Sequence, residues 1–148
     1  MSVEFEGGCL CGAVRYRSSM APQLVGDCYC TDCRKASGTS HCTHAAIAKE
    51  ALSVTGEVRF YDRPADSGNM VSRGFCPECG SAIYSTNSAM PDMAFIRASS
   101  FDDPNLAVPQ LTVYASRAPR WARLDTSRPV FQEMMQGGPQ AALAEARK

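Results

Sequence analysis

The chain has 148 residues, enough for one hydrophobic core but not for two independent ones, so we expect a single domain over residues 1–148. Fifteen Lys and Arg balance fifteen Asp and Glu, which argues against a broad basic surface and against a nucleic-acid partner. No apolar run approaches the roughly 20 residues that span a bilayer, and the N-terminal residues lack the pattern of a secretory signal. We therefore expect no membrane partner and a soluble, cytoplasmic protein.

Short alternating or apolar runs separated by turn residues predict a mainly β fold of short antiparallel sheets. The expected strands are residues 3–6, 13–17, 24–27, 41–48, 58–61, 70–73, 82–84, 93–98 and 111–115. Residues 31–37 predict a single helical turn that Gly38 stops. Residues 140–148 are rich in Ala, Leu and Glu, which predicts a short C-terminal helix within the tail 138–148.

Eight cysteines dominate the chemistry of the chain, and seven of them form three close groups: Cys9 and Cys11; Cys28, Cys30 and Cys33; Cys76 and Cys79. In a reducing compartment such groups favour metal binding over disulfides. Cysteines this close in sequence rarely bridge one another, whereas one zinc ion takes two thiolates from a tight turn. We therefore interpret the groups as zinc ligands.

The segment Cys76-Pro77-Glu78-Cys79-Gly80 has the form of a metal-binding turn. Proline stiffens the turn, and glycine permits the backbone conformation that follows the second ligand. Two more ligands are needed, and Cys9 and Cys11 supply a pair that can face one ion from an extended segment. The sequence thus predicts a closed structural zinc site of Cys9, Cys11, Cys76 and Cys79.

The remaining group, Cys28, Cys30 and Cys33, permits two interpretations. Three ligands with an open fourth position are the arrangement that zinc chemistry requires. Alternatively, Cys42 closes the set and makes a second structural site. Three thiolates give the zinc unit a net negative charge, which disfavours activation of water. Such a centre can still capture a thiol and lower its pKa, so a small thiol is the expected substrate class.

Three stretches of the chain resemble the glutathione-dependent formaldehyde-activating enzyme family, also called the Gfa or centromere protein V-like family, whose fold is similar to that of Mss4. The matching text is GGCLCGAVRY at residues 7–16, CYCTDCRKASG at 28–38 and SRGFCPECGS at 72–81, and the resemblance extends over about residues 5–131.

The resemblance implies an Mss4-like, mainly β fold with two zinc ions per chain. One would be structural, on Cys9, Cys11, Cys76 and Cys79; the other would be more labile, on Cys28, Cys30 and Cys33, with glutathione as co-substrate beside it. The family activity is the formation or cleavage of a carbon–sulfur bond, exemplified by the joining of glutathione to formaldehyde.

Several side chains near the second group are candidates for contact with such a substrate. Arg34 and Lys35 directly follow Cys33 and offer cations for a glutathione carboxylate, and Tyr29 lies between two of the ligands. Weaker candidates are Arg73, Arg97, Arg117 and Arg120.

Two histidines are the other candidates for the fourth ligand of the second group, besides Cys42. His41 and His44 would point to opposite faces of an extended segment, so at most one of them is expected to face the metal.

We hypothesise a zinc-dependent carbon–sulfur lyase that acts on an adduct of glutathione, or of a related small thiol, with formaldehyde or another small aldehyde. Cys28, Cys30 and Cys33 would form its catalytic centre. The alternative is a non-catalytic binding module stabilised by two structural zinc sites. A third possibility is redox sensing or zinc storage by labile thiolates.

Overall fold

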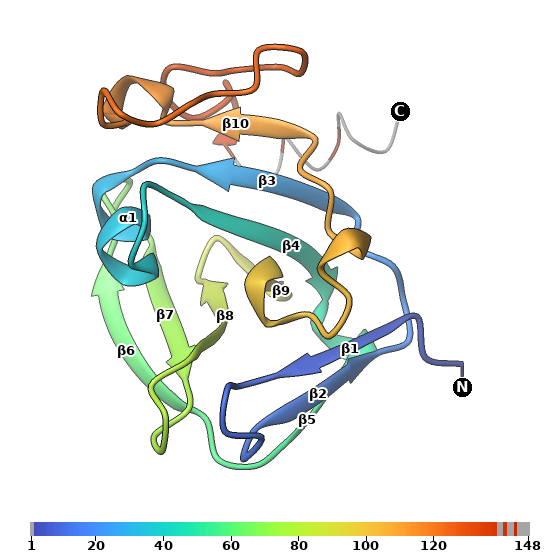
Figure 1. Cartoon of the computed structure of the whole chain (residues 1–148). Helices are drawn as coiled ribbons and strands as arrows, with labels where there is room; N and C mark the ends of the chain where they lie inside the picture. Colours follow the sequence, from blue (N-terminus) through green and yellow to red (C-terminus); the bar gives the residue numbers. More distant parts are fainter. Residues whose placement is uncertain (1, 139–140, 142–143, 145–148) are drawn as a thin grey trace.

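In the computed structural model, which describes residues 2–138, 141 and 144, the chain forms two β-sheets. The smaller sheet has the order β1-β2-β5 and contains β1 (Phe5–Gly8), β2 (Arg15–Ser18) and β5 (Leu52–Thr55). The larger sheet has the order β10-β3-β4-β9-β8-β7-β6 (Figure 1). Its strands are β3 (Leu24–Cys28), β4 (Cys42–Ala48), β6 (Arg59–Pro64), β7 (Met70–Phe75), β8 (Ala82–Asn87), β9 (Met90–Arg97) and β10 (Leu111–Val113).

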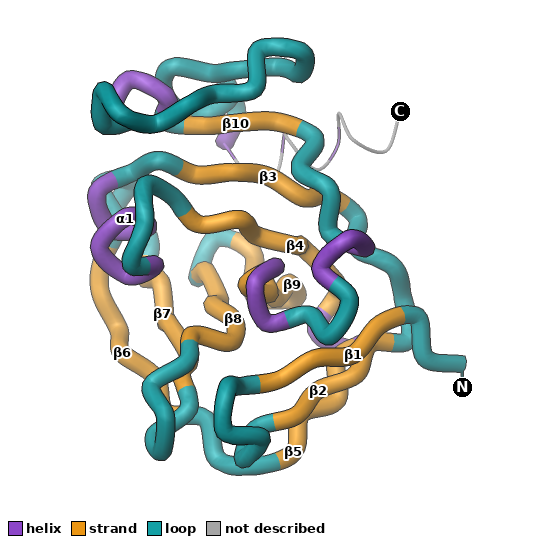
Figure 2. Tube along the Cα trace, viewed as in Figure 1, coloured by secondary structure: helices purple, strands orange, loops and turns teal. Residues whose placement is uncertain are grey.

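Short helical elements connect the strands (Figure 2). Helix α1 (Thr31–Ser37) follows β3, and Gly38 ends it with a φ of 82°, a left-handed conformation that glycine adopts without strain. The 3₁₀ turns are η1 (Lys49–Ala51), η2 (Ala98–Ser100), η3 (Pro104–Leu106) and η4 (Ala115–Arg117). None of the described helices is long and apolar enough to cross a lipid bilayer.

The mainly β architecture predicted from the sequence is confirmed, with two differences. Strand β5 was not among the expected strands, and β10 pairs with β3 in parallel, not antiparallel as expected. β3 and β9 run in the same direction because both are antiparallel to β4, and β10 runs in that direction too, so the connection between β9 and β10 returns the chain to the end of the sheet where β9 begins. The expected C-terminal helix lies largely outside the described residues.

The two faces of the larger sheet differ in what covers them: one packs into the hydrophobic core and the other lines a cavity. Alternate residues of its central strands, including Ala45, Ile47 and Ile96, are fully buried in the main hydrophobic core. Phe5 of the smaller sheet belongs to that core and stacks on Phe101 with ring centroids 4.3 Å apart. The residues between the buried ones point to the opposite face, where they line a cavity. The hydrophobic core therefore holds in place the strands that form the cavity.

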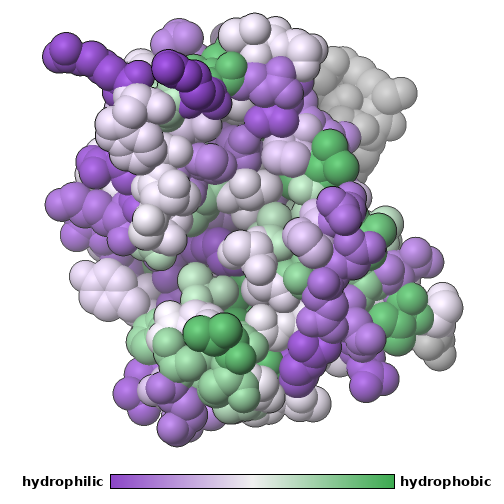
Figure 3. All heavy atoms as spheres, viewed as in Figure 1, coloured by the Kyte–Doolittle hydropathy of each residue, from purple (hydrophilic) through white to green (hydrophobic). Residues whose placement is uncertain are grey.

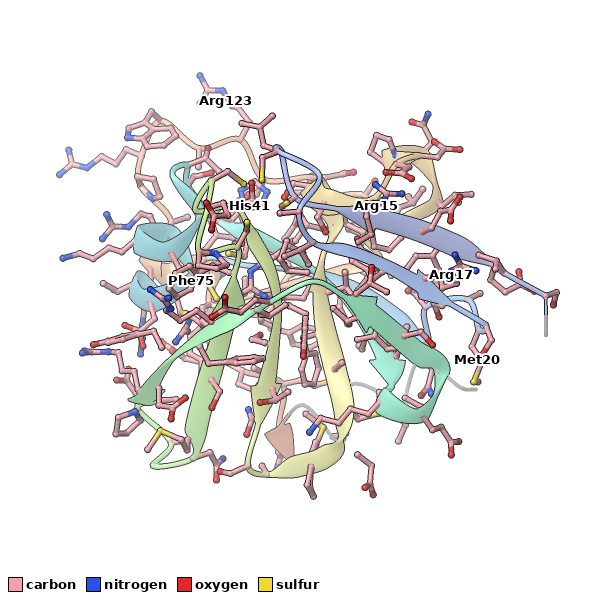
Figure 4. The ribbon with its side chains drawn as sticks, turned by 90° about the horizontal axis from the view of Figure 1, so that it is seen from below. Arg15, Arg17, Met20, His41, Phe75 and Arg123 are labelled. Atoms are coloured by element: carbon pink, nitrogen blue, oxygen red, sulfur yellow. The ribbon has the colours of Figure 1, made fainter. Side chains whose placement is uncertain are left out.

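The outer surface carries no single dominant apolar area on the face shown in Figure 3, where hydrophobic atoms gather in separate groups among hydrophilic ones. Ion pairs at the surface, such as that between Arg15 and Asp102, link different elements of the fold. Arg15 projects from β2 in Figure 4.

Candidate metal centres

Four sulfur atoms from two distant parts of the chain meet at the first candidate centre. Cys9 and Cys11 lie in the turn between β1 and β2, and Cys76 and Cys79 lie in the turn between β7 and β8 (Figure 1). Their Sγ atoms all lie within 4.8 Å of one another. The Sγ of Cys11 is 3.6 Å from that of Cys9 and 3.8 Å from that of Cys76. Four sulfurs at the usual zinc–sulfur distance in a tetrahedron lie about 3.8 Å apart, so this set fits zinc.

Local hydrogen bonds orient this centre. The backbone N–H of Val14 donates to the Sγ of Cys9 over 3.2 Å. The Ser81 hydroxyl lies 3.2 Å from the Sγ of Cys79 and accepts from the backbone N–H of Leu10, so its own proton is available to the sulfur. The hydrogen bond from Ser81 lowers the pKa of Cys79 to about 5. Gly80 has a φ of 77°, as the sequence predicted for the residue after the second cysteine of the turn.

The second candidate centre lies where β3 runs into α1. Cys28 ends β3, Cys30 caps the N-terminus of α1, and Cys33 lies in its first turn. Their Sγ atoms are within 4.8 Å of one another, and the backbone N–H of Cys33 donates to the Sγ of Cys30 over 3.3 Å. The close spacing in sequence thus becomes close spacing in space, because a strand end and one helical turn bring all three side chains to one point.

The three sulfurs cannot all be negatively charged without a cation among them. Hydrogen bonds from Cys28 and then Cys33 lower the pKa of Cys30 to about 2. The same interaction with Cys30 raises the pKa of Cys28 to about 12, and the pKa of Cys33 is raised well above its usual value by its contacts with Cys28 and Cys30. One thiolate therefore forms readily, and its negative charge disfavours the ionisation of the other two cysteines. A divalent cation removes that repulsion, so the donor set suits a metal ion.

Cys42 and His44 on β4 approach the second centre from the side. Their ligand atoms and the Sγ of Cys33 are within 4.8 Å of one another. The Sγ–H of Cys42 donates to the backbone carbonyl of Cys33 over 3.2 Å. The Nε2 of His44 lies 3.4 Å from the Sγ of Cys33.

The role of His44 follows from its second nitrogen. The guanidinium of Arg97, which can only donate, lies with Nη1 3.0 Å from the Nδ1 of His44. Nδ1 is therefore the acceptor, and in the neutral ring the proton is on Nε2, which faces Cys33. Desolvation, followed by the positive charge of Arg97, lowers the pKa of His44 well below its usual value and favours the neutral ring. His44 is thus arranged as a hydrogen-bond donor to the Cys33 sulfur.

Of the two histidines, His44 is grouped with the sulfurs of Cys33 and Cys42, and His41 contacts other residues. Its ring stacks on Tyr29 with centroids 4.7 Å apart, and its Nε2 is 3.7 Å from the carboxylate of Asp27. Figure 4 shows His41 among other side chains, whereas Arg123 extends outward. Asp27 is buried, accepts hydrogen bonds from Thr43 and Arg128, and thereby ties the segment after β10 to β3.

A cavity of about 730 Å³ opens beside the second centre and not beside the first. Cys28, Cys30 and Cys33 line it, as does His44, whereas none of the four cysteines of the first centre does. Its volume is in the range of about 300–1,000 Å³ that is typical of small-molecule sites. The second centre therefore combines, among the described residues, metal-ligating groups with room for a substrate.

Arg73 of β7 is the cavity's available cation. The other arginines that line the cavity are engaged, Arg63 with Asp32 and Arg117 with Asp66. No carboxylate of the described residues lies within ion-pair distance of Arg73, and its buried Nε has no hydrogen-bond partner among them. This guanidinium is thus free to bind an anionic group in the cavity.

Comparison with known proteins identifies the family. The family model described as glutathione-dependent formaldehyde-activating enzyme matches residues 4–117, which is most of the chain. The chain belongs to this family.

Two relatives and one solved structure extend the comparison. A Halomonas elongata protein whose name refers to the same enzyme is 29% identical over 127 residues, which covers 82% of this chain and 81% of the relative. An uncharacterized lyase of Schizosaccharomyces pombe is 26% identical over 98 residues, covering 66% of this chain and 69% of the relative. The crystal structure of a Rhodobacter sphaeroides protein has the same fold, with a TM-score of 0.53 and 20% identity over 66% of this chain and 87% of that one.

The family resemblance drew attention to side chains near the cysteines, and the structure puts some of them outside the cavity. Arg34 is half-buried and Lys35 is exposed on α1, and neither lines the cavity. Tyr29 is buried and packs against His41 instead.

Some residues of the cavity and centre carried little or no signal in the sequence. Arg73 and Arg97 were only weak candidates, and Phe95 was not a candidate at all. The one available signal was a charged residue among the apolar residues of an expected strand, and it applies to both arginines, Arg73 in β7 and Arg97 at the end of β9.

Proposed function

We propose that the protein is a zinc-dependent carbon–sulfur lyase that forms or cleaves the adduct of glutathione, or of a related small thiol, with formaldehyde or another small aldehyde. Membership of the family and the lyase name of one relative support an enzymatic role of this kind. The observation that carries the proposal is the difference between the two centres: the three-cysteine group lines a cavity of substrate size, and no cysteine of the four-cysteine group lines that cavity.

We assign a structural zinc to Cys9, Cys11, Cys76 and Cys79, and a second zinc to Cys28, Cys30 and Cys33. A zinc ion at the second group would bind the substrate sulfur and lower its pKa, so that the sulfur is a good nucleophile in one direction and a good leaving group in the other. The chain's own residues would fix the geometry. His44 donates to the Cys33 sulfur, and Arg97 holds the His44 ring in place.

The substrate's carboxylate is assigned to Arg73. This guanidinium lines the cavity, whereas Arg34 and Lys35 do not. A guanidinium binds a carboxylate through two parallel hydrogen bonds, which would hold the thiol in one orientation and bring its sulfur to the centre.

The net reaction needs no redox partner. In the cleavage direction, the carbon–sulfur bond of the adduct breaks and its electron pair stays on sulfur. The adduct's hydroxyl proton is released as the carbonyl group forms, and the thiol regains one proton. In the other direction the sulfur attacks the carbonyl carbon and the resulting oxygen is protonated.

The non-catalytic binding module stays a second candidate, because Cys42 and His44 also approach Cys33. If either completed the coordination of a second zinc, the centre would be closed and a substrate thiol could not reach the metal. The two candidates therefore differ in whether an external thiol becomes a ligand.

Metal content and cobalt spectroscopy distinguish these functions. We expect about two zinc ions per chain in the wild type and about one in Cys33→Ser, while the matched control Cys42→Ser keeps about two. After exchange for Co²⁺, glutathione should intensify the thiolate-to-cobalt charge-transfer band in the wild type and in Cys42→Ser but not in Cys33→Ser. A spectrum that glutathione leaves unchanged, together with loss of one metal ion from Cys42→Ser, would establish a closed site and refute the lyase.

Activity is measured separately, by the exchange of glutathione between its free form and its formaldehyde adduct at equilibrium. Magnetisation-transfer NMR gives this exchange rate in the presence and absence of the zinc-loaded protein. An acceleration that Cys33→Ser abolishes supports the proposal.

A further inference from the structure

The cavity beside the second centre has an apolar end that formaldehyde would leave unused. Leu24 of β3, Ala46 of β4, and Met90 and Phe95 of β9 line this end and belong to one hydrophobic cluster, separate from the cluster that contains Cys28 and Cys33. Val71 of β7 also lines the cavity, and Leu111 of β10 and Met134 line it where it adjoins the cysteines. A wall of this composition favours a ligand with apolar surface of its own.

Strand register explains why the apolar end and the sulfurs belong to the same cavity. Leu24 and Cys28 are both on β3 and both line the cavity, because residues an even number of positions apart point to the same face. Their separation along the strand is about 13 Å. Leu24 pairs with Ala46, and Ala46 pairs with Phe95, so the apolar row continues across three neighbouring strands.

The chemistry of the thiol and of the aldehyde decides which of them would pack against this apolar row of side chains. Glutathione is a charged tripeptide and would lose hydration without compensation against Leu24 and Phe95. Its carboxylate has a partner in Arg73, which lies in the same row of paired residues but beyond Phe95, with Ser85 between them, at the end of the row opposite Leu24. The carbon side of the adduct is then left to occupy the apolar end, and the single carbon of formaldehyde cannot extend about 13 Å along a strand from the sulfurs.

We propose that the cavity binds thiol adducts whose carbon side carries an apolar group of several carbons, an alkyl chain or an aromatic ring. This inference rests on the proposed function and names its substrate class: adducts of larger apolar aldehydes in preference to that of formaldehyde. The reaction is unchanged. The carbon–sulfur bond breaks with its electron pair on sulfur, the hydroxyl proton is released, and the apolar aldehyde and the thiol separate.

Binding of stable thioethers tests the apolar end without requiring turnover. Isothermal titration of the zinc-loaded protein compares S-hexylglutathione with S-methylglutathione, which differ only in the length of the apolar group. Each methylene removed from water contributes about fourfold in affinity, so five more methylenes in a partly open cavity should give tighter binding on the order of 100-fold.

Two substitutions on β7 make a matched pair. Val71→Phe puts a ring into the apolar end, whereas Met70→Phe makes the same kind of change at the adjacent, exposed residue that does not line the cavity. We expect Val71→Phe to reduce the preference for the hexyl compound to less than about tenfold, and Met70→Phe to retain it. Thermal unfolding of both variants verifies that they fold.

Three results separate this inference from the proposed function. Equal affinities for the two thioethers would overturn the inference even if the formaldehyde adduct is turned over. A preference that Val71→Phe leaves intact would overturn the assignment to this cavity. A preference that only Val71→Phe removes, with no acceleration of any aldehyde exchange, would support the apolar site and refute the lyase.

Discussion

Replacing His44 with leucine should weaken metal binding at the three-cysteine centre without affecting the four-cysteine centre. His44 is arranged to donate its Nε2 proton to the Sγ of Cys33 over 3.4 Å, with Nδ1 engaged by Arg97. A hydrogen bond to a charged group contributes about 1.5–3 kcal/mol. The loss of partners that orient metal ligands typically lowers metal affinity by about 10- to 100-fold, which is about 1.4–2.7 kcal/mol, so the two scales agree.

His44→Gln is the matched control, because its side-chain amide nitrogen can occupy the position of the ring Nε2 and also carries protons. We expect His44→Gln to recover most of the affinity that His44→Leu loses. Competition with a chromophoric chelator gives the dissociation constants of the two zinc ions separately, since the four-cysteine centre serves as an internal reference.

The reasoning is refuted if His44→Gln loses as much affinity as His44→Leu and both variants retain only one metal ion. That result would make the imidazole itself a zinc ligand. Nε2 would then carry no proton and Nδ1 would carry it, so Nδ1 could no longer accept a hydrogen bond from Arg97 in the metal-bound protein.

Three further predictions follow from charged groups of the structure. Asp27→Ala should lower the free energy of unfolding by about 3 kcal/mol in urea titrations, because the partly buried Arg128 loses its buried carboxylate partner and keeps the exposed carboxylate of Asp125, 3.7 Å away. Asp102→Ala at the exposed pair with Arg15 should cost less than about 1 kcal/mol, and similar losses in the two variants would contradict this reasoning. Metal binding at the second centre should release about two protons near neutral pH and strengthen as the pH rises, because the pKa values of Cys28 and Cys33 are raised while Cys30 is already ionised. Calorimetry in buffers of different ionisation enthalpy measures the number of protons released, and a value of zero would be inconsistent with these pKa shifts. Arg73→Met should weaken binding of the thiol by about 10-fold or more, whereas Arg59→Met on the exposed strand β6 should not. Calorimetric titration of both variants with the thiol measures this difference, and equal effects would show that Arg73 does not bind the thiol.

The sequence by itself predicted the parts of the protein that depend on local spacing. The Cys76–Cys79 turn, the helical turn after Cys30 and its end at Gly38 were predictable, because a few neighbouring residues decide the backbone conformation there. The pairing of Cys9 and Cys11 with Cys76 and Cys79 was also predicted, and their sulfurs do converge. Their convergence was predictable because a four-ligand site needs two such pairs.

Only the tertiary structure decided what surrounds the second centre. Cys28, Cys30 and Cys33 are adjacent in the sequence, but Arg73, Phe95 and Leu111 reach the same cavity from strands far along the chain. Strand order and register bring them together, and both depend on long-range pairing that no local pattern encodes. The same holds for His44, whose role as a donor depends on its contact with Arg97 on the neighbouring strand β9.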